Sequence, residues 1–306
     1  MNRLHLTMVV VILLTIAACK KNVTADKISP DTKTSNVVEE CQPLMYSLVV
    51  DSITGASYIF KVLGSPGAGP VSSSPYVVSG TNQLKLCGGG GAPILYATGL
   101  AYDPSTSTFY GTTGNAGPFP NSIFLFTDPN CVTIKPAINV CGIMLDLSDL
   151  ERDQTTGTYY AINRGTSAPH NRIVKLGLPG TLNVTCLPNP LPVGLNARGL
   201  TFNCNGAMYV MHTTGNNGII VFVDKVTGLN GPSFAYPGPI ASSAAVATPD
   251  LGLHFDCTCI GRFITASFNP YIFPTRMTDG MPSGLGSPVY NFATGVLKPT
   301  VDFARP

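Results

Sequence analysis

The feature of this 306-residue sequence that most restricts its fold is an internal repeat with a period of about fifty residues. Each copy has an apolar stretch, a turn opened by Asp or Asn, and a second apolar stretch rich in aromatic residues. The residues that open these turns, with spacings of 52, 50, 50 and 53, are Asp51, Asp103, Asp153, Asn203 and Asp256. A sequence that repeats a segment of this length predicts a fold assembled from repeated structural units.

Several of these turns follow the pattern D-x-x-T-G, as in residues 51–55 and 153–157. An Asp side chain accepts hydrogen bonds from the backbone N–H groups that follow it, and Gly adopts positive φ at the end of the turn. We therefore interpret the repeated Asp residues as turn formers rather than as catalytic acids. Further hairpins are predicted at residues 124–134, 173–184, 219–229 and 289–297, which gives four strands for each period.

A four-stranded unit of this length, repeated in tandem, is typical of a β-propeller blade. A blade cannot bury both of its faces alone, so neighbouring blades must pack against each other. Five periods fit between residues 42 and 304, so we predict an all-β propeller of five blades, with six as the alternative. A β-sandwich is the competing all-β fold, but a sandwich does not require a fifty-residue repeat. The 32 Gly and 26 Pro agree with many short strands joined by turns.

In these turns and strands the chain resembles the extracytoplasmic propellers that carry NHL-like or YVTN-like repeats. The resemblance covers most of residues 41–306 and rests on the repeated strand–turn–strand pattern described above. It implies a propeller fold and no particular activity, because one fold hosts many functions.

The first nineteen residues predict the cellular location of the protein. Arg3 is followed by an apolar run at residues 6–16, an order typical of a secretory signal, and this run is too short to span a bilayer. Residues 16–19, Ile-Ala-Ala-Cys, resemble the lipobox of bacterial lipoproteins, which implies acylation of Cys19 and cleavage just before it. The alternative is an ordinary signal peptide in which Cys19 has no role.

These observations predict three regions: a signal peptide at 1–18, a lipid-anchored flexible tether at 19–40, and the propeller at 41–306. The tether is polar and has no hydrophobic period, as expected of a flexible linker. We expect the protein to lie in the cell envelope, attached through the lipid on Cys19 to the periplasmic face or the cell surface of a bacterial membrane. With 18 basic and 16 acidic residues and a net charge of +2, the chain has no electrostatic footprint for nucleic acid.

The sequence has nine cysteines, and eight remain when Cys19 is set aside. An even number of cysteines in an exported protein indicates disulfides. These eight are Cys41, Cys87, Cys131, Cys141, Cys186, Cys204, Cys257 and Cys259. Proximity in sequence suggests the pairs 131–141, 186–204 and 41–87, which leaves 257 and 259. A metal site is the alternative, but the sequence lacks the paired C-x-x-C spacing and the nearby His that such a site uses. We expect no metal and no cofactor.

In propellers, the loops between the second and third strands of each blade emerge on one face, around the axial opening. Here these loops are residues 112–121, 163–171, 212–217 and 266–271. Their polar side chains make four residues candidates for a ligand-binding face: Thr113, Asn115, Asn163 and Asn216. The alternative is a Gly-Asn turn copied by repeat duplication, because residues 112–117 and 213–218 match each other.

His170, His212 and Arg164 lie in or near these loops and are the candidates for catalysis. Histidine suits acid–base chemistry and arginine suits anion binding, although these residues also occur as polar loop residues. A pair of catalytic carboxylates has little support, because two of the three Glu lie in the predicted tether. The sequence therefore predicts a module that binds an envelope protein or a small polar ligand. The alternative is a propeller lyase or hydrolase with a His/Arg site at the axial mouth.

Overall fold

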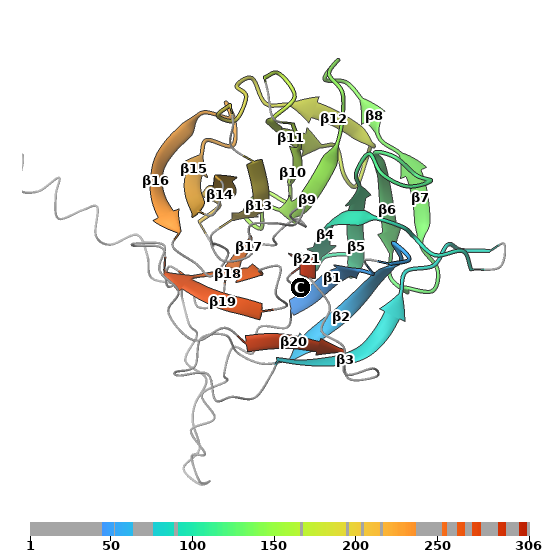
Figure 1. The fold of residues 1–306 in the computed structure, drawn as a ribbon. Coiled ribbons are helices and arrows are strands. Elements are labelled where there is room, and N and C mark those ends of the chain that lie inside the picture. Colours follow the sequence, from blue (N-terminus) through green and yellow to red (C-terminus); the bar gives the residue numbers. More distant parts are fainter. Residues whose placement is uncertain are drawn as a thin grey trace, which may run out of the picture. The chain divides into compact units, whose positions relative to one another are not determined.

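The computed structural model describes residues 45–51, 53–63, 76–88, 91–165, 168–193, 196–202, 205–214, 217–236, 253–255, 262–266, 271–276, 287–291 and 300–304. All the regular elements in these ranges are β-strands (Figure 1), which confirms the all-β prediction. Within these ranges no helix has the length and apolar character needed to cross a membrane. The predicted signal peptide and tether, including Cys19, lie outside the described residues.

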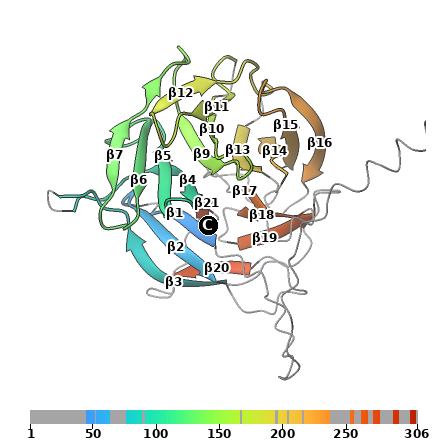
Figure 2. The same ribbon diagram turned by 180° about the vertical axis from the view of Figure 1, so that it is seen from behind.

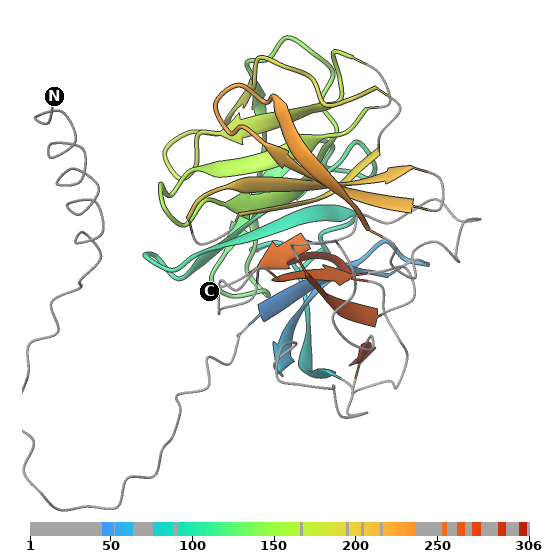
Figure 3. The same ribbon diagram turned by 90° about the vertical axis from the view of Figure 1, so that its left-hand side faces the viewer.

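Three groups of strands pair in antiparallel meanders, and we call each group a set. The first set is β4 (Ala97–Asp103), β5 (Thr108–Thr113), β6 (Ser122–Phe126) and β7 (Thr133–Pro136). The second is β9 (Leu147–Arg152), β10 (Tyr159–Asn163), β11 (Arg172–Leu176) and β12 (Asn183–Cys186), to which β8 (Ile138–Asn139) adds in parallel. The third is β13 (Asn196–Phe202), β14 (Met208–Thr214), β15 (Asn217–Val223) and β16 (Asn230–Tyr236). Figures 2 and 3 show these sets from behind and from the side.

Two further sets are joined through a parallel pairing of β20 with β3. One is β17 (Leu253–Phe255), β18 (Arg262–Ala266), β19 (Tyr271–Arg276) and β20 (Ser287–Asn291). The other combines β1 (Met45–Val50), β2 (Ser57–Leu63) and β3 (Tyr76–Gln83) with β21 (Thr300–Ala304), which pairs with β1. The last described strand of the sequence thus completes the set that contains the first.

The strands at one end of each set contact one another in order, and we call them the inner strands. Strand β21 contacts β4, β4 contacts β9, β9 contacts β13, β13 contacts β17, and β17 contacts β21. Four-stranded meanders packed through such strands form a β-propeller, so the predicted fold is confirmed. The number of blades, five or six, stays a prediction.

The turn at Asp51 does not have the place that the sequence repeat suggests. The repeat puts the turn at Asp51 between the first and second strands of a set, as the turn that Asp103 opens joins β4 to β5. Because β21 takes the inner place in its set, β1 and β2 are the second and third strands, and Asp51 joins those two instead. The N-terminal copy is therefore out of phase with the others by one strand.

The repeated Asp residues that the structure describes act in the turns as predicted, whereas Asn203 and Asp256 lie outside the described residues. Oδ1 of Asp153 accepts a hydrogen bond from the backbone N of Thr155 at 2.9 Å, and Gly157 has a φ of 71°. In the turn between β15 and β16, Oδ1 of Asp224 accepts bonds from the backbone N of Val226 and Thr227 at 2.9 and 2.7 Å. These carboxylates therefore accept hydrogen bonds from backbone N–H groups of the turns that they form.

Three clusters of buried apolar side chains lie between neighbouring sets. They join the β1–β3 set to the β4–β7 set, that set to the β9–β12 set, and the latter to the β13–β16 set. Adjacent aromatic residues serve different clusters: Phe109 and Tyr110 belong to the first and second, and Tyr159 and Tyr160 to the second and third. Because successive residues of a strand point to opposite faces, these sets bury both faces.

The inner strands approach each other closely at one point. A β-carbon on Gly99 of β4 would lie 2.5 Å from the backbone N of Leu150 in β9, so only glycine fits there. On the other side of β4, the backbone N of Leu100 donates to Oδ2 of Asp302 in β21 at 2.7 Å. Oγ1 of Thr98 donates to the backbone O of Leu147 at 2.7 Å. Neighbouring inner strands are thus joined by specific polar contacts.

Charged pairs also connect the sets, at the turns that follow the inner strands. Nζ of Lys225 lies 2.5 Å from Oδ2 of Asp153, whose side chain is fully buried, and a guanidinium N of Arg152 lies 3.7 Å from Asp103. Burial alone would raise the pKa of Asp153, but hydrogen bonds from Lys225 and Thr155 outweigh it and lower the pKa below its ordinary value. Asp103 and Asp153, which form turns in their own sets, therefore each also pair with a cationic side chain of the next set.

Two disulfides join residues 44 and 45 apart: Cys87–Cys131 and Cys141–Cys186. The predicted pairs 131–141 and 186–204 are therefore wrong, as is 41–87, while the prediction of disulfides is confirmed for these four residues. Cys41, Cys204, Cys257 and Cys259 lie outside the described residues.

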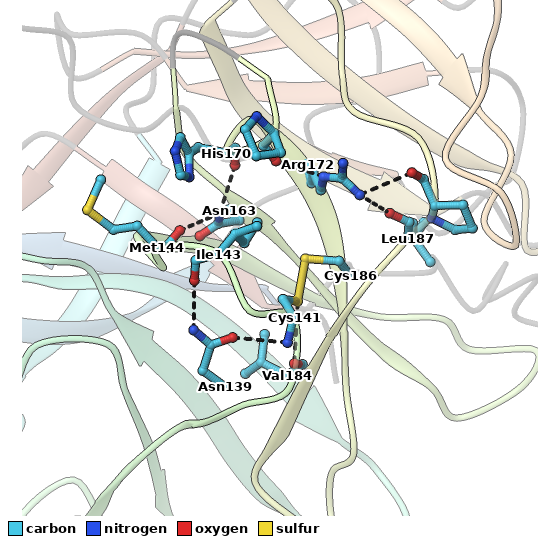
Figure 4. The surroundings of a disulfide bond; sticks show 12 residues. Asn139, Cys141, Ile143, Met144, Asn163, His170, Arg172, Val184, Cys186 and Leu187 are labelled. Atoms are coloured by element: carbon cyan, nitrogen blue, oxygen red, sulfur yellow. Dashed lines mark hydrogen bonds between the residues drawn. A yellow bond between two sulfur atoms is a disulfide. The ribbon is translucent and has the colours of Figure 1, made fainter.

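The physical reason is that each disulfide ties a connector between two sets to the outer part of the next set. Leu86 forms a parallel bridge to Val132 beside Cys87–Cys131, and β8 runs parallel to β12 beside Cys141–Cys186 (Figure 4). Proximity in sequence favoured pairs within a turn, whereas the connectors reach forward by almost one period. Stable disulfides indicate an oxidising, extracytoplasmic location.

Removing one disulfide tests this pairing. We expect the double substitution Cys141→Ser and Cys186→Ser to lower the free energy of unfolding by about 4 kcal/mol, because the bond closes a loop of 45 residues. Urea denaturation measures this change. Peptide mapping of the native protein without reduction should yield a cross-linked 141–186 peptide, and a 131–141 peptide would contradict the assignment.

Candidate functional site

The predicted ligand face corresponds to the end of the sets where the inner strands begin. Ala97 pairs with Thr113, and Leu147 pairs with Asn163, so the loops that follow β5 and β10 lie beside the starts of β4 and β9. Tyr96 and Asp146 are the residues just before these two inner strands, one period apart. The two repeats thus bring their loops and strand starts to the same end.

We call the surface formed by Tyr96, Asn115, Asp146 and Arg164 the rim. Nη2 of Arg164 lies 3.0 Å from Oδ1 of Asp146, and the same oxygen accepts a hydrogen bond from the backbone N of Asn115 at 2.8 Å. The side chains of Arg164 and Asp146 are 24% and 29% exposed. Arg164 is thus paired with a carboxylate that sequence reasoning missed.

A fixed loop conformation supports the rim. Nδ2 of Asn121 donates to Oδ1 of Asn115 at 2.9 Å and to the backbone O of Leu145 at 2.8 Å, while Oδ1 of Asn121 accepts from the backbone N of Leu147 at 3.2 Å. One asparagine therefore links the loop after β5 to the start of β9. Asn115, a predicted face residue, remains exposed.

Two other candidates, Asn163 and Thr113, are buried and serve the backbone. Nδ2 of Asn163 donates to the backbone O of Met144 at 3.0 Å and of His170 at 2.7 Å (Figure 4), and its Oδ1 accepts from the backbone N of Asp146 at 2.6 Å. Oγ1 of Thr113 accepts from the backbone N of Ser122 at 3.0 Å. These side chains position the loops, and Asn163 holds Asp146 in place.

His212 occupies in β14 the place that Thr113 and Asn163 have in β5 and β10, because Ala197 pairs with it as Ala97 pairs with Thr113. Its side chain is fully buried, and neither ring nitrogen has a hydrogen-bond partner among the described residues. Burial lowers the pKa of His212 to about 4, so the imidazole is neutral at neutral pH. The fourth face candidate, Asn216, lies outside the described residues.

His170 is partly buried, and its Nδ1 has no partner among the described residues. Within the same ranges, no hydrogen bond or ion pair joins the ring of His170 or His212 to Arg164, whose partner is Asp146. The described contacts therefore link Arg164, through Asp146, to Asn115 and to Asn163. They do not unite Arg164 with the two histidines. In the part of the chain that the structure describes, no three His, Cys, Asp or Glu side chains group as metal ligands would.

The repeat period is the signal that would have found the missed residues. Residues 96, 146 and 196 share one place, just before or at the start of an inner strand, and they are Tyr, Asp and Asn. Comparing the copies column by column exposes this position, whereas looking for catalytic residue types in the loops does not.

His212 gives a prediction about stability and pH. The unfolded chain binds the histidine proton near pH 6.5 and the folded protein only near pH 4, so protonation favours the unfolded chain as the pH falls through this window. The expected loss from this group is about 3 kcal/mol. His212→Leu should remove this loss and raise the free energy of unfolding at neutral pH by about 1 kcal/mol, because an unpaired polar ring is replaced.

Urea denaturation at a series of pH values measures this effect. His170→Leu, which removes a partly exposed histidine, is the matched control. If His212→Leu shows the same loss of stability between pH 6.5 and 4 as the native protein, the environment assigned to His212 is wrong.

No protein-family model and no curated protein matches the chain. Among solved structures, the chain is similar to a gluconolactonase from Xanthomonas campestris, with 13% identity and a TM-score of 0.46 over 81% of this chain and 77% of that one. It is also similar to virginiamycin B lyase from Staphylococcus aureus, with 13% identity and a TM-score of 0.41 over 78% and 68%. A third similar structure is a luciferin-regenerating enzyme, with 13% identity and a TM-score of 0.44 over 83% of this chain and 80% of that one. We draw no activity from similarities of this size.

Proposed function

We propose that this protein is a lipid-anchored binding module of the bacterial cell envelope, and that its rim is the binding surface. The observation that carries the proposal is the rim itself: polar side chains that remain exposed while they are fixed by hydrogen bonds. Asp146 and Arg164 are each about a quarter exposed, and both are held by neighbouring groups. Such a surface loses little conformational entropy when a partner binds.

The extracytoplasmic location supports this role. The two disulfides indicate an oxidising compartment. Residues 16–19 have the order of a lipobox, so we propose Cys19 as the site of the lipid. A polar segment at residues 20–40 would then let the propeller stand clear of the membrane. An envelope protein or a small polar ligand is the partner that this arrangement suits.

Hydrolase or lyase chemistry is the alternative, and His170 is the residue that would support it. The residue is only partly buried, whereas its Nδ1 is itself buried and has no hydrogen-bond partner among the described residues. Histidine is the side chain best suited to acid–base chemistry near neutral pH. His212 offers less for such chemistry, because its side chain is fully buried.

Replacing the anchor residue tests the proposed attachment. In a bacterial host that processes lipoproteins, we expect the native protein in the membrane fraction and Cys19→Ala in the soluble fraction, because one side chain carries the lipid. Ala18→Gly, which keeps a small residue before the cysteine, is the matched control and should remain in the membrane. Equal membrane retention of Cys19→Ala and the native protein would contradict the anchor.

Capture of an envelope component from the same membranes tests the binding role. Loss of capture in Arg164→Ala would support the rim as the surface. Turnover of a small molecule that disappears in His170→Ala would replace this proposal by the enzymatic alternative.

A further inference from the structure

We infer that the rim binds a neutral carbohydrate, with Tyr96 as the surface on which a sugar ring stacks and the Asp146–Arg164 pair as the group that binds its hydroxyls. This inference rests on the proposed function and adds the class of ligand. It begins from Tyr96, an aromatic residue that the loop-based search of the sequence did not select.

Tyr96 is unusual in its exposure and in its backbone. The residue is 41% exposed, although most of the aromatic residues of the described strands are packed in the core. Its φ is 55°, a left-handed conformation that is rare for a large side chain. Its backbone N donates to the backbone O of Gly55 at 2.8 Å, which fixes this conformation. Strain of this kind persists where the surrounding structure imposes it, and such places are often functional.

Two glycines from different sets hold the ring. A β-carbon on Gly55 would lie 2.5 Å from Cζ of Tyr96, and one on Gly117 would lie 2.7 Å from its Cδ2. Both glycines have positive φ, 73° and 85°, so other residues would be strained there as well as overlapping the ring. The ring therefore lies directly against two backbones. An aromatic ring that is fixed before binding loses little entropy when a ligand stacks on it.

The ion pair and this ring both lie against the loop that follows β5. A β-carbon on Gly114 would lie 2.6 Å from Nη2 of Arg164 and 2.8 Å from Oδ1 of Asp146, so the start of the loop touches the pair. Gly117, which touches Tyr96, is three residues further along this loop. Three residues span at most about 11 Å even when extended. The ring and the ion pair are therefore within reach of one short oligosaccharide.

The chemistry of these groups selects the ligand class. A pyranose ring has one face lined by C–H bonds, which packs on an aromatic ring, and an edge of hydroxyls, which donate and accept hydrogen bonds. Asp146 offers carboxylate lone pairs and Arg164 offers several N–H donors, and both are partly exposed. Their charges cancel at a separation of 3.0 Å, so the rim has no net charge to attract a phosphate or a carboxylate. A neutral sugar satisfies both the ring and the pair.

Titration calorimetry with neutral oligosaccharides tests the inference. The probes are cellotetraose, maltotetraose and chitotetraose, and the protein is the full chain in a detergent that contains no sugar. We expect one of the three to bind, Tyr96→Phe to retain that binding, and Tyr96→Ala to weaken it about tenfold through the loss of stacking. Asp146→Asn should weaken it as well, because the pair with Arg164 is lost. Val226→Ala is the control, since Val226 is 73% exposed in the distant turn between β15 and β16.

Three results would overturn the inference: no binding of any of the probes, unchanged binding by Tyr96→Ala, or binding only of an acidic oligosaccharide. Circular dichroism and the thermal unfolding midpoint show whether each variant is folded. If Tyr96→Ala does not fold, Tyr96→Leu takes its place, because it keeps apolar volume without an aromatic face. Capture of an envelope protein in the absence of sugar binding would leave the proposed function standing and remove only the carbohydrate.

Discussion

The close approach of the inner strands is the constraint on which the rest of the structure depends. Gly99 lets the backbone of β4 reach that of β9, and Asp302 in β21 accepts the backbone N–H of Leu100. With the strands this close, the apolar faces of neighbouring sets meet in shared clusters, so no set needs to be stable alone. The same contacts line up the starts of the inner strands, and the rim is built on those starts.

Two ion pairs of the described residues hold neighbouring parts of the structure together. Only 11% of the residues are charged, yet Asp153 pairs with Lys225 and Asp146 pairs with Arg164 across different parts of the repeat. One pair is at the turn end, where it binds the sets together, and the other is at the rim, where it stays partly exposed.

The sequence predicted the features that depend on local pattern, and the structure was needed for those that depend on contacts between distant segments. The period predicted the four-stranded unit and the turn-forming role of Asp153 because every copy must solve the same packing problem. It did not predict that β21 would displace β1 from the inner place, since strand order depends on contacts between distant segments. The disulfide partners were missed for the same reason. Asp146 and Tyr96 were missed because their roles arise from a loop of another element.

Amide hydrogen exchange at Leu100 tests the packing of the inner strands most directly. In the native protein this N–H is buried and bonded to Oδ2 of Asp302, so it should exchange only when the whole domain unfolds. In Asp302→Ala it should exchange faster relative to the amide of Val221, which lies in the middle of β15. Equal protection of Leu100 relative to Val221 in both proteins would contradict the account.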